Sequence, residues 1–279
     1  MLDDTPRIAV LGAMASELTA LRKELTETTE HTVVGAAFTT GVLAGKAVVL
    51  VRCGVSMVNA AMVAQRTLDL FNVTHLMVSG CAGGVEPELK VGDVFVASQW
   101  GHYLDVVMGR EGPSGFEPAS GIPSGYGNFG MMFPKAAVVT GPDGETERRF
   151  WFPVAPAMLA AARKLAVTVV LSKGAGAAQL DKTPRVVAGG NGVSGSAFVN
   201  NTELRDYVYA TFEAGVLDCE SAAVAQVAWC NGKPFVAVRG LSSLAGAGDG
   251  DKLYTAFNQL ASDNAAAVTL GLIRALQMG

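Results

Sequence analysis

One stretch of this sequence, residues 215–243, constrains the fold more than any other. It reads GVLDCESAAVAQVAWCNGKPFVAVRGLSS, and this pattern predicts a short strand, a polar turn, a helix, a second strand and a second polar turn. The helix is apolar on almost all sides, which indicates that it is buried. Both turns would then open on the same edge of a sheet, where open α/β sheets place their ligands.

The same alternation of strands and helices continues along the whole chain. Half of the residues are apolar, which is ample for a large core. We therefore predict the α/β class, with a single three-layer α/β/α domain over residues 1–279 and a central mixed β-sheet. Strands are expected at 7–11, 75–78, 92–97 and 185–188, a hairpin at 38–41 and 47–51, and helices at about 56–71, 155–166 and 251–276.

The segment at about 109–149 breaks this pattern. It is rich in glycine, proline and serine, with isolated aromatic residues and little periodicity. Loops of this length in compact domains are usually functional or mobile. The composition predicts a long loop or lid within the domain, because strand and helix patterns resume after it.

Charge and cysteine usage exclude several function classes. Only 16% of residues are charged and the net charge is −4, so there is no basic field for nucleic acid or an anionic membrane. The four cysteines and three histidines are scattered, which indicates neither a disulfide framework nor a metal site. The GxGxxG and GxxxxGK[ST] fingerprints are missing, and no cofactor is expected.

The N-terminal segment MLDDTPR carries no apolar signal region. No later stretch keeps the roughly 18 apolar residues of a membrane-spanning helix. We therefore expect a cytoplasmic protein that handles a small molecule.

Several polar or glycine-rich segments follow predicted strands. Glu17 and Glu220 each begin a predicted helix, where a carboxylate either caps the helix or faces a ligand, and the helix N–H groups would keep Glu220 ionised. The run SGCAGG at 79–84 allows close backbone approach to a ligand or forms a plain turn. Position alone favours Phe198 as a core residue over an exposed stacking surface.

Six motifs occur in one order along almost the whole chain: GAMASE (12–17), SGCAGG (79–84), KVGDV (90–94), GSAFVN (195–200), LDCESAAVA (217–225) and VAVRGLSS (236–243). Together they resemble the nucleoside phosphorylase and nucleosidase superfamily, and within it the methylthioadenosine/S-adenosylhomocysteine nucleosidases. Other segments, among them FWFPVAP (150–156) and SQWGHY (98–103), are similar to the plant bark and vegetative storage proteins.

This resemblance implies an N-glycosidic hydrolase acting on a purine ribonucleoside or a 5′-modified adenosine. Glu17 matches the glutamate that activates water, and Glu220 matches the glutamate that binds the ribose 2′ and 3′ hydroxyls. Phe198 would stack on the base and the backbone of Val199 would read its edge. Further substrate-binding positions implied by the resemblance are Met14, Cys81, Gly83, Val106, Cys219, Arg239 and Ser242. Relatives form dimers or larger rings, so a homo-oligomer is expected.

One position departs from the family pattern. Ser243 stands where the family's nucleosidases place an aspartate that protonates the leaving purine, and a serine hydroxyl donates a hydrogen bond but delivers no proton near neutral pH. Asp249 or Asp251 is an alternative acid. A non-catalytic nucleoside-binding or storage protein is therefore an alternative to a hydrolase.

A phosphate-dependent phosphorylase is the second alternative. Such an enzyme grips phosphate with arginines, and a carboxylate beside the nucleophile repels it. Arg52, which follows a predicted strand, is the arginine that could serve this purpose.

Overall fold

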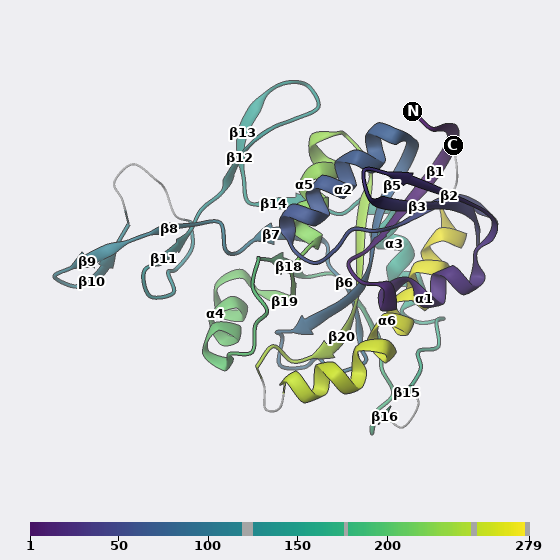
Figure 1. Cartoon of the computed structure of the whole chain (residues 1–279). Coiled ribbons are helices and arrows are strands. Elements are labelled where there is room, and N and C mark those ends of the chain that lie inside the picture. The colour runs from purple at the N-terminus through teal and green to yellow at the C-terminus, as the bar shows by residue number, and fades with distance from the viewer. Residues whose placement is uncertain (119–124, 176–177, 247–249, 277–279) are drawn as a thin grey trace.

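The computed structural model of the chain describes residues 1–118, 125–175, 178–246 and 250–276 (Figure 1). The helices are α1 (Ala15–Glu24), α2 (Met57–Leu70), α3 (Pro156–Leu165), α4 (Thr202–Phe212), α5 (Ser221–Cys230) and α6 (Gly250–Ala275). The strands of the main sheet are β1 (Asp3–Gly12), β2 (Thr26–Val33), β3 (Ala36–Leu43), β4 (Lys46–Arg52), β5 (Phe71–Gly84), β6 (Val94–Val96), β7 (Gln99–His102), β14 (Trp151–Pro153), β17 (Val186–Ala188), β18 (Asn191–Ser194), β19 (Ala214–Asp218) and β20 (Phe235–Ser243).

These strands form one mixed sheet. Its main path runs β14-β7-β18-β19-β5-β1-β4-β3-β2, and β20 pairs with both β5 and β6. The pairs β1–β4, β1–β5 and β5–β20 are parallel, whereas β2–β3, β3–β4 and β5–β19 are antiparallel. The expected hairpin at 38–41 and 47–51 is confirmed as β3–β4.

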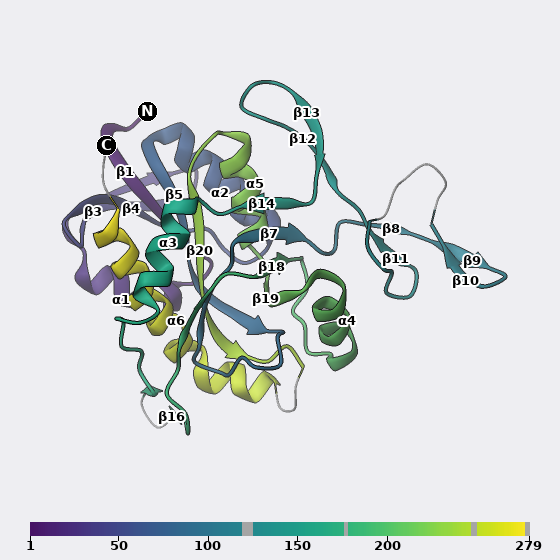
Figure 2. The same cartoon turned by 180° about the vertical axis from the view of Figure 1, so that it is seen from behind.

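Helices cover both faces of the sheet (Figures 1 and 2). Helices α1 and α3 pack against α6 on one face, and α2 packs against α5 on the other. The predicted α/β class with a central mixed sheet between two helical layers is confirmed. Across the described ranges, no helix combines the length and the hydropathy required to span a bilayer.

Strands β5 and β20 run side by side through the middle of the sheet and extend beyond their predicted ends. We expected turns at SGCAGG and at the LSS that ends 236–243, but both segments continue as strand, with Arg239 opposite Gly80 and Gly240 opposite Cys81. Glycine in this part of the strand leaves room for side chains that cross it. A Cβ at Gly80 would lie 2.3 Å from a carboxylate oxygen of Glu17 and 2.6 Å from Nη1 of Arg239.

The segment at about 109–149 is not the structureless loop that the composition predicts. Its described part forms three two-stranded units that extend from the sheet (Figure 2). They are β8 (Val106–Met108) with β11 (Met132–Pro134), β9 (Arg110–Gly112) with β10 (Gly115–Glu117), and β12 (Ala137–Thr140) with β13 (Thr146–Arg149). Short strands separated by Gly and Pro turns show too little periodicity for recognition from sequence. The remaining pair is β15 (Gly174–Ala175) with β16 (Ala178–Gln179).

Helix α6 crosses β20 so closely that one glycine becomes essential. A Cβ built on Gly240 would lie 2.0 Å from the backbone oxygen of Ala261. We predict that Gly240→Ala lowers the free energy of unfolding by about 1–3 kcal/mol or more, because the helix must move. Urea denaturation measures this loss. Gly125→Ala is the control, since nothing lies within 4 Å of its Cβ, and an equal loss in both variants would contradict the prediction.

Candidate active site

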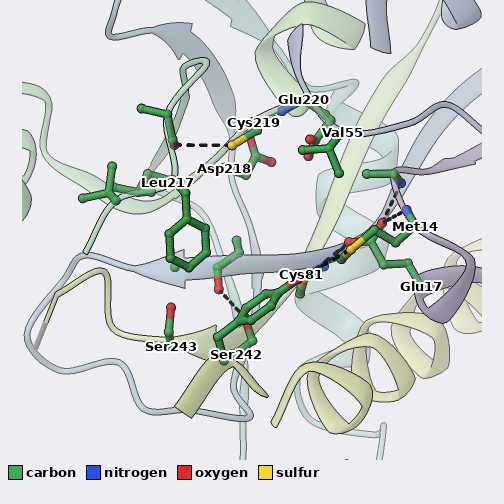
Figure 3. A pocket seen from close by; sticks show the side chains of 17 residues that line it. Met14, Glu17, Val55, Cys81, Leu217, Asp218, Cys219, Glu220, Ser242 and Ser243 are labelled. Carbon is green, nitrogen blue, oxygen red and sulfur yellow. Dashed lines mark hydrogen bonds between the residues drawn. The ribbon is translucent and has the colours of Figure 1, made fainter. Parts of the chain in front are cut away.

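A pocket opens where α1, β5, β19, α5, β20 and α6 meet (Figure 3). It encloses about 590 Å³ of space, part of it open to solvent. Most of the predicted site residues line it: Met14, Glu17, Cys81, Gly83, Phe198, Val199, Cys219, Glu220, Ser242 and Ser243. Tertiary structure thus brings together side chains that lie more than 200 positions apart in the sequence.

Two predicted residues do not line the pocket. Val106 lies on β8, in the segment that extends from the sheet, and it is not among the residues that line the pocket. Arg239 lies beneath the pocket with 0% of its side chain exposed, and its guanidinium group is directed at protein carboxylates. Asp249 and the side chain of Asp251, the two alternative acids, lie outside the described residues.

Arg239 holds three carboxylates from three different elements. Its Nε lies 2.7 Å from Asp218 Oδ2, its Nη2 lies 3.0 Å from Glu220 Oε2, and its Nη1 lies 3.8 Å from Glu17 Oε1. Burial disfavours the charged guanidinium, but the attraction of the carboxylates outweighs it and raises the pKa of Arg239. The arginine is therefore a permanent cation that fixes the floor of the pocket.

Asp218, rather than Glu220, caps helix α5. Its Oδ1 accepts hydrogen bonds from the backbone N–H groups of Glu220 at 3.2 Å and Ser221 at 3.1 Å. It also accepts from the Ser194 hydroxyl. The glutamate side chain, which the sequence left as a possible cap, is thereby free to face the pocket.

Glu220 is 5% exposed and accepts a hydrogen bond from the backbone N–H of Ser56 at 3.0 Å. Burial raises the pKa of its carboxyl, with repulsion from Asp218 and Glu17 acting in the same direction and Arg239 opposing both. The expectation that helix N–H groups hold Glu220 ionised is wrong, because Asp218 takes those groups. The pocket therefore holds a carboxylate that a positive or hydroxylated ligand would stabilise in its charged form.

Glu17 both caps helix α1 and faces the pocket, the two alternatives that its position in the sequence left open. Its Oε2 accepts from the backbone N–H of Ala13 at 2.6 Å and of Met14 at 3.1 Å, which is a capping contact. Its Oε1 accepts from the N–H of Cys81 at 2.9 Å and from the Cys81 thiol at 3.4 Å. These donors come from the α1 turn and from β5, so the carboxylate is fixed at the pocket wall.

The charge of the pocket lining is one-sided. Among the described residues that line it are the carboxylates Glu17, Asp218 and Glu220, and no lysine or arginine. Arg52 lines a different cavity, beside Arg22 and the outer face of α1. A phosphate dianion would find no free cation among these lining residues.

The opposite end of the pocket has a different character. Phe198 is 62% exposed at the rim, so the preference for a buried core residue is wrong. Its ring meets Tyr254 edge to face, with centroids 5.5 Å apart. In the view of Figure 3, Ser242 and Ser243 lie at the end of the pocket away from Glu220. This end presents an aromatic surface and hydroxyls.

Sequence reasoning missed two polar residues that line the pocket, Asp218 and Tyr254. Asp218 directly follows a predicted strand beside Glu220, and that position is a signal that could have found it. Tyr254 lies in a helical segment with no motif of its own. Only the packing of α6 beside the pocket identifies it.

The raised pKa of Glu220 makes stability depend on pH. The folded state binds the proton more tightly than the unfolded state, so this contribution is complete below the unfolded pKa of about 4.5 and is lost as the pH rises through the folded pKa. We predict that Glu220→Gln gains stability relative to the wild type as the pH rises through that window. Urea titrations of both proteins across the acidic and neutral range measure the difference, and a constant difference would contradict the prediction.

Comparisons with known proteins identify the family of this chain. Residues 7–274 match the family model described as the phosphorylase superfamily. A 5′-methylthioadenosine/S-adenosylhomocysteine nucleosidase of Bacillus pumilus is 31% identical over 242 residues, which cover 86% of this chain and 87% of the relative. The structure of such a nucleosidase from S. pneumoniae with the transition-state inhibitor MT-ImmA aligns with a TM-score of 0.74 and 25% identity, covering 97% of this chain and 100% of the other.

The native structure of a futalosine hydrolase of Helicobacter pylori also has a TM-score of 0.74, at 21% identity, with 97% of this chain and 98% of the other covered. At that identity the likeness establishes the fold alone. The match over nearly the full length agrees with the resemblance that the six motifs carry. The chain belongs to the phosphorylase superfamily.

Proposed function

We propose that this protein is a nucleosidase that hydrolyses the N-glycosidic bond of a purine ribonucleoside or a 5′-modified adenosine. The observation that carries the proposal is the group of three carboxylates around one buried arginine, in a pocket whose described lining offers no cation. The curated relatives named as 5′-methylthioadenosine/S-adenosylhomocysteine nucleosidases support it.

The charge of this group suits the reaction. Breaking an N-glycosidic bond develops positive charge on the sugar and negative charge on the departing base. Three carboxylates and one guanidinium give the pocket floor a formal charge of up to −2. Fixed negative charge in a partly dry site stabilises a developing cation more than the neutral substrate. Glu220 would also accept hydrogen bonds from the sugar hydroxyls.

Water is the acceptor that fits this lining. Glu17 is held by backbone donors at the pocket wall and would orient a water molecule and take its proton. Phosphate would be repelled by the carboxylates and finds no arginine among the described lining residues, and Arg52 lies in another cavity. The phosphorylase alternative is therefore disfavoured.

The leaving-group end favours a second candidate function. Ser243 lines the pocket and is largely buried, and its hydroxyl can hold a purine nitrogen without protonating it. A protein that binds a nucleoside or a base without cleaving it would need no more than this. Calorimetric binding with no base released would favour this role, and a chain that neither binds nor cleaves would favour storage.

An activity panel tests the proposed function. We expect pure protein to release free base from at least one of 5′-methylthioadenosine, adenosine and inosine, at a rate that added phosphate does not increase. Glu17→Gln should lower that rate by about 10²–10⁴-fold, because it removes the general base. Chromatographic detection of free base measures both effects. No release from any of the three nucleosides would refute the nucleosidase assignment.

Supplying the missing acid tests the role of position 243. We predict that Ser243→Asp raises kcat for adenine nucleosides by roughly 10²-fold, because a carboxyl group can protonate the departing base. Ser196→Asp is the matched control, since it adds the same group at an exposed position outside this pocket. Equal rates for wild type and the Ser243 variant would contradict the prediction.

A further inference from the structure

Tyr254 places a hydroxyl group inside the pocket, and the proposed reaction does not use this group. The residue lies near the start of α6 and lines the pocket together with Met14 and Phe198. Its ring stands at 81° to the ring of Phe198. Its hydroxyl donates to the Met14 sulfur at 3.5 Å, so the polar end of the side chain is directed to the part of the pocket next to Glu17.

This hydroxyl is poorly satisfied as a donor. A thioether sulfur is a weak acceptor, and Met14 Sδ is the hydrogen-bond partner that the described residues provide. Burial, reinforced by the negative groups nearby, raises the pKa of Tyr254 to about 12. The phenol therefore keeps its proton at neutral pH. A ligand oxygen would be a better acceptor than the sulfur that it now contacts.

The layers of the fold indicate which part of a nucleoside this hydroxyl meets. Glu220 begins helix α5 on one face of the sheet, whereas Tyr254 belongs to helix α6 on the other face. If Glu220 holds the 2′ and 3′ hydroxyls with Phe198 beside C1′, the C4′ side of the ribose, which carries C5′, faces the α6 layer, where the hydroxyl of Tyr254 lies. The base then lies at the Phe198 end, away from the hydroxyl of Tyr254.

We infer that Tyr254 is a specificity-determining residue that donates a hydrogen bond to the 5′ oxygen of the sugar. This inference rests on the proposed function and narrows it: the preferred substrates are purine ribonucleosides with a free 5′ hydroxyl, rather than 5′-thioethers. A thioether at C5′ would offer the phenol no better acceptor than Met14 does. A 5′ oxygen would accept a stronger hydrogen bond from the Tyr254 hydroxyl than the Met14 sulfur does.

The test compares substrates that differ only at the 5′ position. We expect the wild type to show a kcat/KM for adenosine about threefold to tenfold above that for 5′-deoxyadenosine and 5′-methylthioadenosine, the range of one neutral hydrogen bond. Tyr254→Phe should lower kcat/KM for adenosine to the level of the other two and leave those two unchanged. If the enzyme prefers hypoxanthine as the base, the same comparison is made with inosine and 5′-deoxyinosine.

Tyr209→Phe serves as the control, because Tyr209 is 41% exposed on α4 and does not line the pocket. It should change none of the ratios. An equal loss of kcat/KM for all substrates in Tyr254→Phe would indicate a packing role and overturn the inference. An unchanged preference for the 5′ hydroxyl in that variant would overturn it as well.

Failure of the proposed function is distinguishable from failure of this inference. If the wild type releases no base, the nucleosidase assignment fails. The preference for the 5′ hydroxyl is then measured by calorimetric binding of adenosine and 5′-deoxyadenosine. A tighter affinity for adenosine that disappears in Tyr254→Phe would then support the inference. Equal affinities, or no binding of either nucleoside, would overturn it.

Discussion

The buried guanidinium of Arg239 is the contact on which the rest of the site depends. It reaches carboxylates from α1, from the end of β19 and from the start of α5. A buried charge of this kind is tolerated only when it is well paired, and removing one partner of such a group typically costs about 3–5 kcal/mol. The surrounding elements are therefore held to one arrangement, in which glycine at position 80 leaves the space that two of the side chains occupy.

That arrangement also explains why the pocket has two chemically different ends. At the Glu220 end, the carboxylates outnumber the cation Arg239, and Asp218 takes the capping role in place of Glu220. At the Phe198 end, the described lining offers an exposed aromatic ring and the hydroxyl of Ser243. For the reaction proposed above, the described lining suits stabilisation of a cationic sugar better than protonation of a departing base.

The fold class and the location of the candidate site could be predicted from the sequence, because local patterns indicate both. The apolar runs of β1, β5 and β20 and the apolar helix α5 predict a layered α/β fold, and the glutamates after two strands indicate where a ligand binds. The segment at 109–149 was misread because strands of three or four residues leave no periodic signal. The segments at 79–84 and 241–243, where turns are expected, are strand instead, because glycine and serine in a central strand resemble a turn until the neighbouring strand is known.

The sequence by itself determined the fold class, the superfamily and most of the pocket residues, since hydrophobic periodicity and short motifs depend on neighbours along the chain. Only the tertiary structure decided which carboxylate caps α5, that Arg239 lies beneath the pocket, that Phe198 is exposed and that Tyr254 reaches the site. These properties depend on contacts between elements far apart in sequence. Burial, pairing and charge balance are set by those contacts, and they have no signature in any one segment of the chain.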